Sequence, residues 1–476
     1  MRIQNHPVLD FHWGQRDEIK FSYQGKEISA KKGDTIASAL FNAGVKEFSK
    51  SKKRGRSRGF YCAIGKCSSC LMTVDGIPNV RTCITLAKEG MSVQEQEGLA
   101  KLPKKCGKSG DGSYEGTCET EVVVIGGGPA GLKAALGAAE AGASVNLIEE
   151  NNELGGQLVK QTHKFFGSSE KEAGTRGVQI AKELENEVKN NEKIEVSLGS
   201  SVVGIYEGNL LGIYNRGKSY ERMKADKIVL ATGASERMIS FPNNDLPGVY
   251  GAGGVQTLMN LQGIKPADKA IILGAGNVGL IVAYQLMQAG TDVKAIVEAL
   301  PEIGGYFVHA AKVRGQGVPI FTSHTVVRVE GNDQLEKVIT AEIDKNWDVV
   351  DGTKKEWEVD MLALAVGLSP GYKLADQAGC EIQYVSKLGG YVPIRDERLE
   401  TTRDGIYIAG DLSGIEEATT AMMEGEIAGI AAAWSMGCGD SSDENKIRDI
   451  YERLDILREG PLYKGVREGL EEVVIS

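Results

Sequence analysis

Residues 120–150 read TEVVVIGGGPAGLKAALGAAEAGASVNLIEE, and this stretch decides the fold. An apolar strand runs into a glycine turn, an alanine-rich helix follows, and a second apolar strand ends in an acid, which is the order of a βαβ unit. The glycines are spaced Gly-x-Gly-x-x-Gly between strand and helix, where a pyrophosphate meets the positive end of the helix. The stretch therefore predicts a Rossmann-like dinucleotide-binding domain.

The residues of this turn are the first predicted cofactor ligands. The first glycine makes the turn, the second admits the pyrophosphate, and the third packs the helix against the strand. Glu149, at the end of the second strand, is expected to accept hydrogen bonds from ribose hydroxyls. The predicted ligands within the turn are Gly126, Gly128, Pro129, Ala130 and Gly131.

A second copy of the unit occupies residues 269–299, KAIILGAGNVGLIVAYQLMQAGTDVKAIVEA. The two copies are nearly equal in length, which predicts an internal duplication. The acid at the strand end favours NAD(H) over NADP(H), because it suits a free 2′-hydroxyl. Another adenine nucleotide, or a structural role, stays open because the helix carries no acid within LIVAYQL. The predicted ligands are Gly274, Gly276, Asn277, Gly279, Glu298 and Gly367.

Upstream of both copies, residues 61–83 read YCAIGKCSSCLMTVDGIPNVRTC. Cys62-x4-Cys67-x2-Cys70 followed by a distant Cys83 is the plant-type [2Fe-2S] spacing, in which four thiolates hold two irons. Zinc sites usually use two short cysteine pairs, whereas only one short pair is present here. We therefore expect these four cysteines to hold a [2Fe-2S] cluster, with Gly65 letting the loop turn its N–H groups towards sulfur.

The other cysteines and the basic run before the cluster loop are assigned no chemistry. Structural or solvent-facing thiols are the interpretation for Cys106, Cys118, Cys380 and Cys438. The run 50–58, KSKKRGRSR, is interpreted as a solvated loop in preference to a docking patch for an acidic partner or a phosphate.

Composition sets the class of protein. A chain of 476 residues exceeds the size near which single cores stop growing, about 250–300 residues. The 61 glycines fit repeated strand-turn-helix units, and the net charge of −10 argues against a nucleic-acid surface. There is no signal-like start and no apolar run of about 18 residues, so we expect a cytoplasmic protein without a membrane span.

Three short segments indicate which nucleotide the first site holds: LGGQL (154–158), ATGA (231–234) and IYIAGD (406–411). Together with the glycine turns they resemble the glutathione-reductase-like flavoproteins, which have two dinucleotide-binding domains. The resemblance implies FAD in the first site, the GD aspartate near the ribityl-pyrophosphate, and a helix N-terminus facing the flavin, where it stabilises negative charge. The further FAD ligands so implied are Gly156, Gln157, Thr232, Gly233, Gly410, Asp411, Thr420 and Ala421.

The segment beside the predicted flavin departs from the disulfide reductases of this fold. Those enzymes carry a redox cysteine pair there, whereas residues 155–167 read GGQLVKQTHKFFG and contain none. Disulfide reduction is therefore not expected. His163 and Lys164 are the catalytic candidates that could tune the flavin, with ordinary polar residues as the alternative.

The whole chain resembles the α or A subunit of multi-subunit amine and imino-acid dehydrogenases. This group includes sarcosine oxidase, dye-linked proline and hydroxyproline dehydrogenases, opine oxidase and hydrogen cyanide synthase. The resemblance rests on KKGDTIASALFNAGV (31–45), VDGIPNVRTC (74–83), NNDLPGVY (243–250) and TTRDGIYIAGD (401–411).

This closer resemblance implies that a separate β-type flavoprotein subunit oxidises the substrate and that this chain relays electrons. The implied cofactors are FAD, the [2Fe-2S] cluster, NAD(H) or another adenine nucleotide, and FMN at a subunit interface. A small iron-sulfur subunit is a further implied partner. Two alternatives stay open: a self-sufficient NADH-dependent reductase, and a non-catalytic scaffold whose second site holds ATP or NAD.

The predicted fold class is α/β, with two Rossmann-like domains of the glutathione-reductase type preceded by a β-grasp ferredoxin-like domain. The predicted parts are a ferredoxin-like domain (1–102), a linker (103–119), an FAD-binding domain (120–236 and 366–438), a second nucleotide-binding domain (237–365) and a helical tail (439–476). The tail is expected to pack on the core or on a partner.

Overall fold

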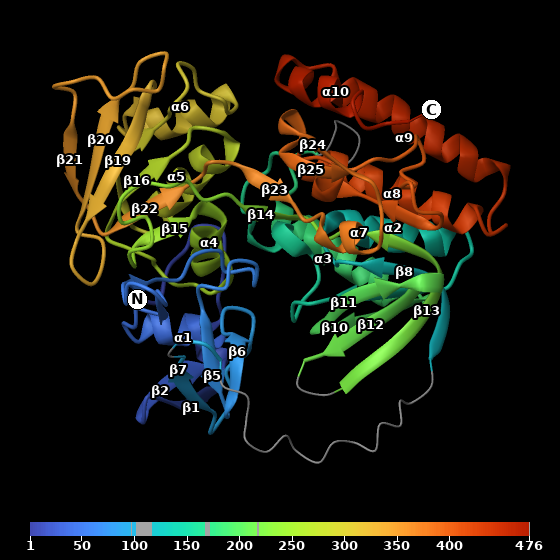
Figure 1. Cartoon of the computed structure of the whole chain (residues 1–476), viewed down its shortest axis with the longest axis horizontal. Helices are drawn as coiled ribbons and strands as arrows, with labels where there is room; N and C mark the ends of the chain where they lie inside the picture. The colour runs from blue at the N-terminus through green and yellow to red at the C-terminus, as the bar shows by residue number, and fades with distance from the viewer. Residues whose placement is uncertain (97, 101–116, 167–171, 217–218, 476) are drawn as a thin grey trace. The chain divides into compact units, whose positions relative to one another are not determined.

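The chain crosses three times between two units, so each unit is built from two separated segments. The structure is a computed structural model and describes residues 1–96, 98–100, 117–166, 172–216 and 219–475 (Figure 1). Unit 1 comprises residues 1–108 and 236–367, and unit 2 comprises residues 109–235 and 368–476.

Unit 2 is organised by a sheet whose strands follow the first glycine motif. The strand order is β10-β9-β8-β13-β12-β11, and β26 pairs with β13 in parallel. β8, β9 and β10 are parallel, whereas β11 and β12 form an antiparallel extension. The strands are β8 (Cys118–Ile125), β9 (Val145–Glu149), β10 (Ile194–Leu198), β11 (Ser200–Tyr206), β12 (Leu210–Asn215), β13 (Ser219–Leu230) and β26 (Ile406–Ile408).

Both faces of this sheet are buried, which explains the unbroken apolar run in β8. Val122 and Val124 belong to the core formed with α2 (Pro129–Glu140) and α8 (Ala418–Trp434). Val123 and Ile125, one residue out of phase, belong to the opposite core, which contains residues of α7. A strand buried on both faces needs apolar residues at every position. The other helices are α3 (Gly177–Lys189), α7 (Lys373–Gln377), α9 (Ser441–Arg458) and α10 (Lys464–Leu470).

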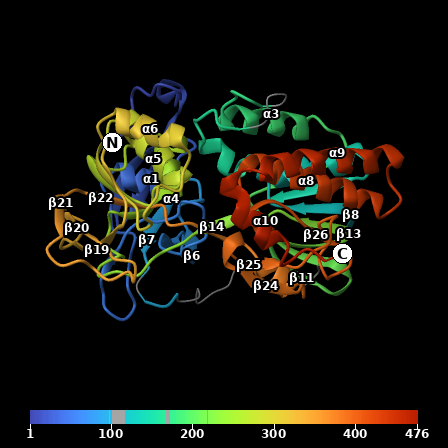
Figure 2. The same ribbon diagram turned by 90° about the horizontal axis from the view of Figure 1, so that it is seen from above.

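Helices α2 and α8 approach each other closely because α8 carries glycines on the shared face. A Cβ atom on Gly425 or on Gly429 would lie 2.0 Å from the carbonyl oxygen of Ala130 or Ala134, respectively. Gly137 of α2 faces α8 in the same way, with the Glu426 carbonyl oxygen 2.9 Å from such a Cβ. Only glycine allows this backbone contact. Helix α9 in turn packs along α8 (Figure 2).

Unit 1 begins with the ferredoxin-like part, residues 1–96. Its sheet has the order β2-β1-β7-β5-β6, in which β1 and β7 are parallel and the other pairs antiparallel. Helix α1 (Ile36–Asn42) packs on β2 and is capped by Thr35, whose Oγ1 accepts a hydrogen bond from Ser38 N at 3.1 Å. The strands are β1 (Glu18–Tyr23), β2 (Lys26–Lys31), β5 (Leu71–Val74), β6 (Ile77–Arg81) and β7 (Ser92–Glu95).

The remainder of unit 1, residues 236–367, is called the second nucleotide part. Its parallel sheet has the order β15-β22-β16-β17-β18, and a three-stranded antiparallel sheet has the order β19-β20-β21. The elements of the parallel sheet are β15 (Val249–Gly251), β16 (Lys269–Leu273), β17 (Asp292–Val297), β18 (Ile320–Phe321), β22 (Met361–Leu364), with helices α4 (Ala252–Gln256), α5 (Asn277–Gln288) and α6 (Phe307–Gly315). The antiparallel strands are β19 (His324–Glu330), β20 (Lys337–Glu342) and β21 (Lys355–Glu358).

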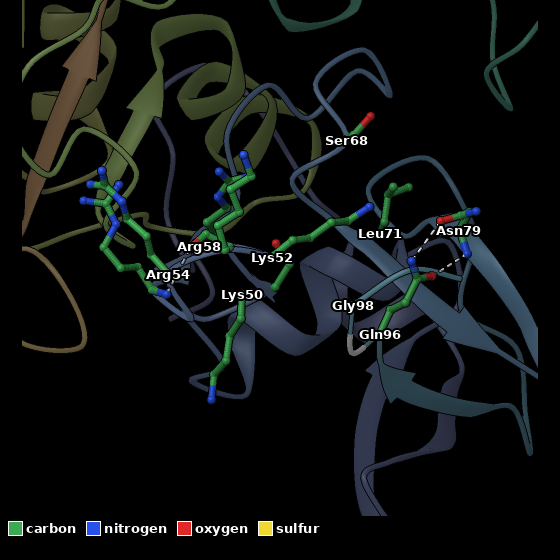
Figure 3. Close-up of a pocket in the computed structure, with 13 residues that line it drawn as sticks. Lys50, Lys52, Arg54, Arg58, Ser68, Leu71, Asn79, Gln96 and Gly98 are labelled. Carbon is green, nitrogen blue, oxygen red and sulfur yellow. Dashed lines mark hydrogen bonds between the residues drawn. The ribbon is translucent and has the colours of Figure 1, made fainter. Parts of the chain in front are cut away.

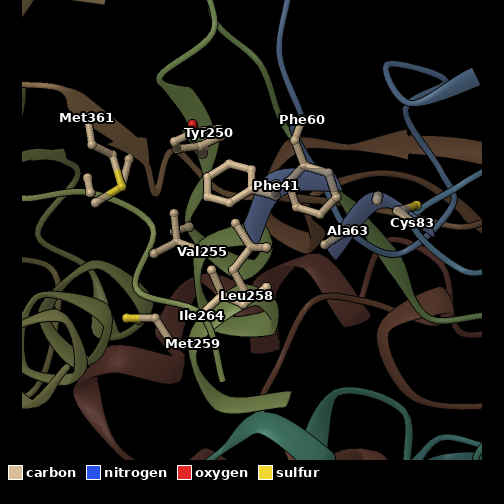
Figure 4. Packing of buried hydrophobic residues seen from close by; sticks show 14 of the residues in the cluster. Phe41, Phe60, Ala63, Cys83, Tyr250, Val255, Leu258, Met259, Ile264 and Met361 are labelled. Atoms are coloured by element: carbon tan, nitrogen blue, oxygen red, sulfur yellow. The ribbon is translucent and has the colours of Figure 1, made fainter. Parts of the chain in front are cut away.

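The ferredoxin-like part and the second nucleotide part share one hydrophobic core. Phe41 of α1 contacts Tyr250 of β15 edge-on, with ring centroids 6.1 Å apart, and both side chains are buried (Figure 4). Backbones also meet, because a Cβ atom on Gly254 would lie 2.1 Å from the Tyr61 carbonyl oxygen. Tyr61 immediately precedes Cys62, the first of the four cysteines predicted to hold the cluster, so the loop that carries these cysteines (the cluster loop) is anchored on the second nucleotide part.

The observed architecture confirms the predicted α/β fold class, with two Rossmann-like parts and a ferredoxin-like part ahead of them. Strand β8 begins at Cys118, inside the segment predicted as a linker, and Cys106 lies outside the described residues. The C-terminal tail is helical and packs on α8 of its own unit. No helix within the described ranges is long and apolar enough to cross a bilayer.

We expect Gly429→Ala to destabilise unit 2 by roughly 1–3 kcal/mol, the usual cost of overpacking, because the new methyl group overlaps the Ala134 carbonyl oxygen. The control is Gly465→Ala in α10, where an added Cβ meets no atom within 4 Å. Circular dichroism melting compares the two variants. Equal melting temperatures would contradict the close contact between α2 and α8.

Candidate functional site

The four cysteines near the start of unit 1 come together as two pairs. A thiol–thiol hydrogen bond joins Cys62 to Cys67, and a second joins Cys70 to Cys83. A [2Fe-2S] cluster takes four thiolates shared between two irons, which matches two pairs. The pairing of the four thiols is therefore compatible with two irons that each bind two thiolates.

The loop that carries these cysteines adopts backbone conformations that ordinary residues avoid. Ala63, Gly65 and Ser68 all have left-handed φ angles, of 59°, 74° and 63°. A Cβ atom on Gly65 would also lie 2.8 Å from Ile84 Cδ1. Strain of this kind persists where the surroundings hold it, and it collects at functional sites. Here it wraps the chain around the four sulfurs.

Hydrogen bonds within each pair shift the pKa values of the two thiols in opposite directions. The bond from Cys62, together with the Ser69 N–H, lowers the pKa of the Cys67 thiol to about 5 despite its burial. The bond from Cys83 lowers the pKa of Cys70, while the same two bonds raise the pKa of the donors Cys62 and Cys83. Thiolates are the form that binds metal.

In unit 2, the first glycine turn has three glycines in three different surroundings. A Cβ atom on Gly126 would lie 2.3 Å from the Ala231 carbonyl oxygen, and one on Gly131 would lie 1.7 Å from the Gly126 carbonyl oxygen. The nearest atom to such a Cβ on Gly128 is Gly156 Cα at 3.8 Å. Chain packing therefore requires glycine at the first and third positions, while the second, at the N-terminus of α2, has no neighbouring atom closer than ordinary van der Waals contact.

Glu149 closes this turn from the end of β9. Its Oε2 accepts a hydrogen bond from Gly127 N at 2.6 Å, and its Oε1 accepts from Asn151 N and Asn151 Nδ2, both at 2.7 Å. A carboxylate offers about four lone-pair positions, of which these bonds take three. The buried carboxylate is therefore held in a fixed orientation with acceptor capacity left on Oε2.

The second glycine turn, in unit 1, repeats this geometry. A Cβ on Gly274 would lie 2.2 Å from the Ala365 carbonyl oxygen, one on Gly279 would lie 2.0 Å from the Gly274 carbonyl oxygen, and Gly276 has no atom within 4 Å. Glu298 Oε2 accepts from Ala275 N at 2.6 Å and its Oε1 from Leu300 N at 2.9 Å. The duplication predicted from the sequence thus extends to hydrogen bonds.

Each turn is also contacted by a glycine pair that follows the acid. Gly155 N donates to the Gly127 carbonyl oxygen at 2.8 Å, and Gly305 N donates to the Ala275 carbonyl oxygen at 3.0 Å. A Cβ on Gly156 would lie 2.6 Å from Gly128 Cα. Gly156 was predicted from the sequence, whereas Gly304 and Gly305 were not. The pair of glycines that follows each acid in the sequence could have indicated them.

A buried ion-pair network adjoins the predicted GD element of unit 2. Gly410 N donates to Glu424 Oε2 at 3.0 Å, and Glu424 Oε1 pairs with Arg458 Nη2 at 2.8 Å. Arg458 also binds Glu416 through Nη2 at 2.5 Å and Nε at 3.0 Å. Burial, with Glu424 and Glu416 nearby, raises the pKa of Asp411 to about 7. The ion pairs of this network were not predicted from the sequence, because Glu416, Glu424 and Arg458 lie in no motif.

The remaining predicted FAD ligands all lie in unit 2, in loops, a 3₁₀ helix and the first turn of α8. Thr232 Oγ1 donates to the Gly371 carbonyl oxygen at 3.0 Å, and Gly233 has a left-handed φ of 65° with open space around it. Gln157 is exposed within the 3₁₀ helix Gly156–Lys160. Helix α8 begins at Ala418, so Thr420 and the buried Ala421 lie inside its first turn rather than at its start.

Three remaining predictions concern Gly367, His163 and Lys164. Gly367, with a left-handed φ of 101°, accepts a hydrogen bond from Arg237 N at 3.0 Å in unit 1. His163 stacks on Phe166 with ring centroids 4.5 Å apart, and Lys164 is exposed. These contacts lie within their own segment, and a role in catalysis stays a prediction.

The cysteines outside the cluster loop are not paired with each other. Cys118 is exposed, Cys438 is half-buried, and Cys380 is buried with its Sγ 3.3 Å from Thr401 Oγ1. None of these three contacts a second thiol in the part of the chain that the structure describes.

Two known protein families match this chain, one over the dinucleotide-binding parts and one over the part with the four cysteines. Residues 120–425 match the family described as pyridine nucleotide-disulphide oxidoreductase. Residues 16–98 match the 2Fe-2S iron-sulfur cluster binding domain.

Individual relatives span most of the chain. Sarcosine oxidase subunit alpha of Corynebacterium sp. (strain P-1) is 27% identical over 446 residues, covering 88% of this chain and 44% of the relative. This chain therefore spans less than half the length of that relative. Hydrogen cyanide synthase subunit HcnB of Pseudomonas protegens is 28% identical over 356 residues, covering 71% and 75%. The crystal structure of L-proline dehydrogenase from P. horikoshii superposes with a TM-score of 0.71 at 27% identity, covering 94% and 79%.

We expect Arg458→Met to destabilise unit 2 by about 3–5 kcal/mol, because it leaves buried carboxylates unpaired. Thermal melting measures the loss, and Arg458→Met/Glu424→Gln should recover part of it by removing one of those charges. The matched control is Arg448→Met on the same helix, where the side chain is exposed. Equal melting of the two single variants would contradict a stabilising role for the network.

Proposed function

Because the chain belongs to the pyridine nucleotide-disulphide oxidoreductase family, we propose that it is the electron-relay subunit of an amine or imino-acid dehydrogenase. The chain is an oxidoreductase with an FAD-binding and a 2Fe-2S-binding domain. The relatives confirm the resemblance to α-type subunits made from the sequence. The observation that carries the proposal is the joining of a paired-cysteine loop and a second nucleotide part in one core.

The first glycine turn of unit 2 is the proposed FAD site. FAD supplies the exchange of electrons singly or in pairs. Gly128 leaves room for the pyrophosphate at the N-terminus of α2, and Glu149 retains an acceptor for a ribose hydroxyl. Asp411, with its pKa raised to about 7, is proposed to hold the ribityl chain, where a carboxyl group that is part-protonated at neutral pH can donate as well as accept.

The four cysteines of unit 1 are proposed to hold the [2Fe-2S] cluster, which supplies single-electron transfer. Cys62 and Cys67 would bind one iron, and Cys70 and Cys83 the other, because these are the pairs that lie together. The N–H groups of Lys66 and Ser69 donate to sulfur and stabilise its negative charge. Such N–H groups tune the reduction potential of a cluster. Reduced thiols also fit the cytoplasm, which we propose as the location.

The second glycine turn is proposed to bind NAD(H) or another adenine nucleotide. Gly276 faces open space and Glu298 is held as Glu149 is, so the space for a pyrophosphate is repeated. We propose that a β-type flavoprotein subunit oxidises the substrate, with FMN between the subunits, because the relatives are themselves named as subunits. The repeated geometry also favours a second candidate function, an NADH-dependent reductase that needs no partner.

We expect Cys83→Ala to remove the [2Fe-2S] centre, because one iron loses a member of its thiolate pair. After anaerobic reconstitution, the iron content of the variant should lie below the wild-type value of about two irons per chain. The EPR signal that dithionite induces should also be lost. Cys118→Ala, which changes an exposed thiol, should keep both. An unchanged EPR signal in Cys83→Ala would refute this ligand set.

A stopped-flow experiment separates the two candidate functions. Under the relay proposal, NADH bleaches the FAD of the isolated chain slowly compared with substrate added to the complex that contains the β-type subunit. Rapid bleaching by NADH alone would support the reductase instead. In that case Gly276→Val should abolish it, because the side chain fills the open space of the second turn, while Gly128→Val should lose FAD.

A further inference from the structure

A short, strongly basic hairpin lies in unit 1 directly ahead of the loop that carries the four cysteines. β3 (Ser49–Lys50) and β4 (Ser57–Arg58) are antiparallel, and the turn is closed by Ser51 N, which donates to the Arg56 carbonyl oxygen at 2.8 Å. We call residues 49–58 the basic hairpin. Its cations are Lys50, Lys52, Lys53, Arg54, Arg56 and Arg58.

The charges at the base of the hairpin are neutralised, whereas those at its tip are not. Asp245 pairs with Arg56 at 2.8 Å and lies 3.9 Å from Arg58, and Lys50 lies 3.5 Å from Glu47. The exposed tip carries Lys52, Lys53 and Arg54, and none of the three pairs with a carboxylate of the described residues. A concentrated positive charge thus stands out on a chain whose net charge is −10.

This positive charge lies beside the part of the cluster loop nearest to solvent. The hairpin lines a hollow of about 450 Å³ together with Ser68 and Leu71, which stand between and directly after the cysteines of the short pair (Figure 3). Ser49 Oγ donates to the Ser69 carbonyl oxygen at 3.1 Å, which fixes the hairpin to that loop. Cys67 is the partly exposed member of the four cysteines, whereas the others are buried.

We propose that the basic hairpin is the docking surface for an acidic one-electron carrier protein, which takes electrons from the [2Fe-2S] cluster. The inference rests on the proposed function. In each transfer the cluster is oxidised by one electron and the carrier's redox centre is reduced by one, with no bond made or broken and no proton moved. The hairpin steers the carrier towards the exposed edge of the cluster loop.

The features of the surface fit a protein partner better than a small anion. Lys52, Lys53 and Arg54 are exposed on flexible stems, which suits a broad, salt-screened contact. Leu71 and Gly98 line the hollow, and Leu99, the residue after Gly98, is 75% exposed, so apolar surface is available near the charges. Electron-transfer encounters of this kind are small, below about 1,200 Å², and depend on charge for their rate of association.

The test compares two variants with the same change in formal charge. Lys52→Glu/Arg54→Glu reverses the hairpin tip, and Lys345→Glu/Lys354→Glu reverses two exposed lysines on the β20–β21 side of unit 1. The acceptor is the soluble domain of cytochrome b5, an acidic one-electron haem protein. It is mixed in a stopped-flow instrument with the full chain, which has been reduced by dithionite and then freed of excess dithionite by anaerobic gel filtration. The basic protein cytochrome c serves as the acceptor of opposite charge.

We expect the hairpin variant to reduce cytochrome b5 at least about tenfold more slowly at ~10 mM ionic strength, with the difference shrinking towards ~0.5 M salt. Its affinity for oxidised cytochrome b5, measured by titration calorimetry, should fall in parallel. Neither effect should appear with cytochrome c or in the control variant. The EPR spectrum and the reduction potential of the cluster should stay the same in both variants.

Three outcomes would overturn the docking surface. One is an unchanged rate and affinity in the hairpin variant, and another is an equal loss in the control variant. The third is full inhibition by submillimolar pyrophosphate at constant ionic strength, which would identify a small-anion site. A wild-type chain that assembles no cluster under reconstitution would instead refute the proposed function itself, so the two failures are distinguishable.

Discussion

The close contact between the Tyr61 carbonyl group and Gly254 fixes the start of the cysteine-bearing loop against the second nucleotide part. No side chain fits between the two backbones, so the loop that starts at Cys62 is held against α4 with little freedom. Tyr61 Oη reinforces the contact by donating to the Arg237 carbonyl oxygen at 2.8 Å. The ferredoxin-like part is therefore an integral piece of a larger core rather than a domain on a tether, and the left-handed residues of its loop are supported from behind.

The two glycine turns are stabilised by the same hydrogen bond. In each, an acid at the end of the second strand accepts an N–H from the residue between the first two glycines, at 2.6 Å. This bond orders the turn before any nucleotide arrives, which reduces the cost of ordering on binding. What differs is the neighbourhood. The first turn lies close to α8 and its ion network, and the second belongs to the unit that carries the cluster loop.

Much of the fold and part of the candidate site were predictable because they depend on short spacings. The cysteine pattern, the two glycine turns and the acids that close them are each local, so the chain displays them in order. The pairing of Arg458 with Glu424 and Glu416 joins α9 to α8 and to the segment that precedes α8. No pattern in the sequence predicts such a contact between separate elements. The common core of Phe41 and Tyr250 joins residues far apart in the sequence. Thr420 and Ala421, implied as FAD ligands by the resemblance, lie within the first turn of α8, which begins at Ala418 without a capping side chain.

The division of each unit between two chain segments bears on how the protein is made. Residues 1–108 are synthesised well before residues 236–367. The apolar face of α1 therefore stays uncovered while residues 109–235, the first segment of unit 2, are synthesised. Arg458 reaches Glu424 later still. Neither unit can reach its final packing co-translationally from its first segment alone, and both nascent halves present apolar surface that invites chaperones.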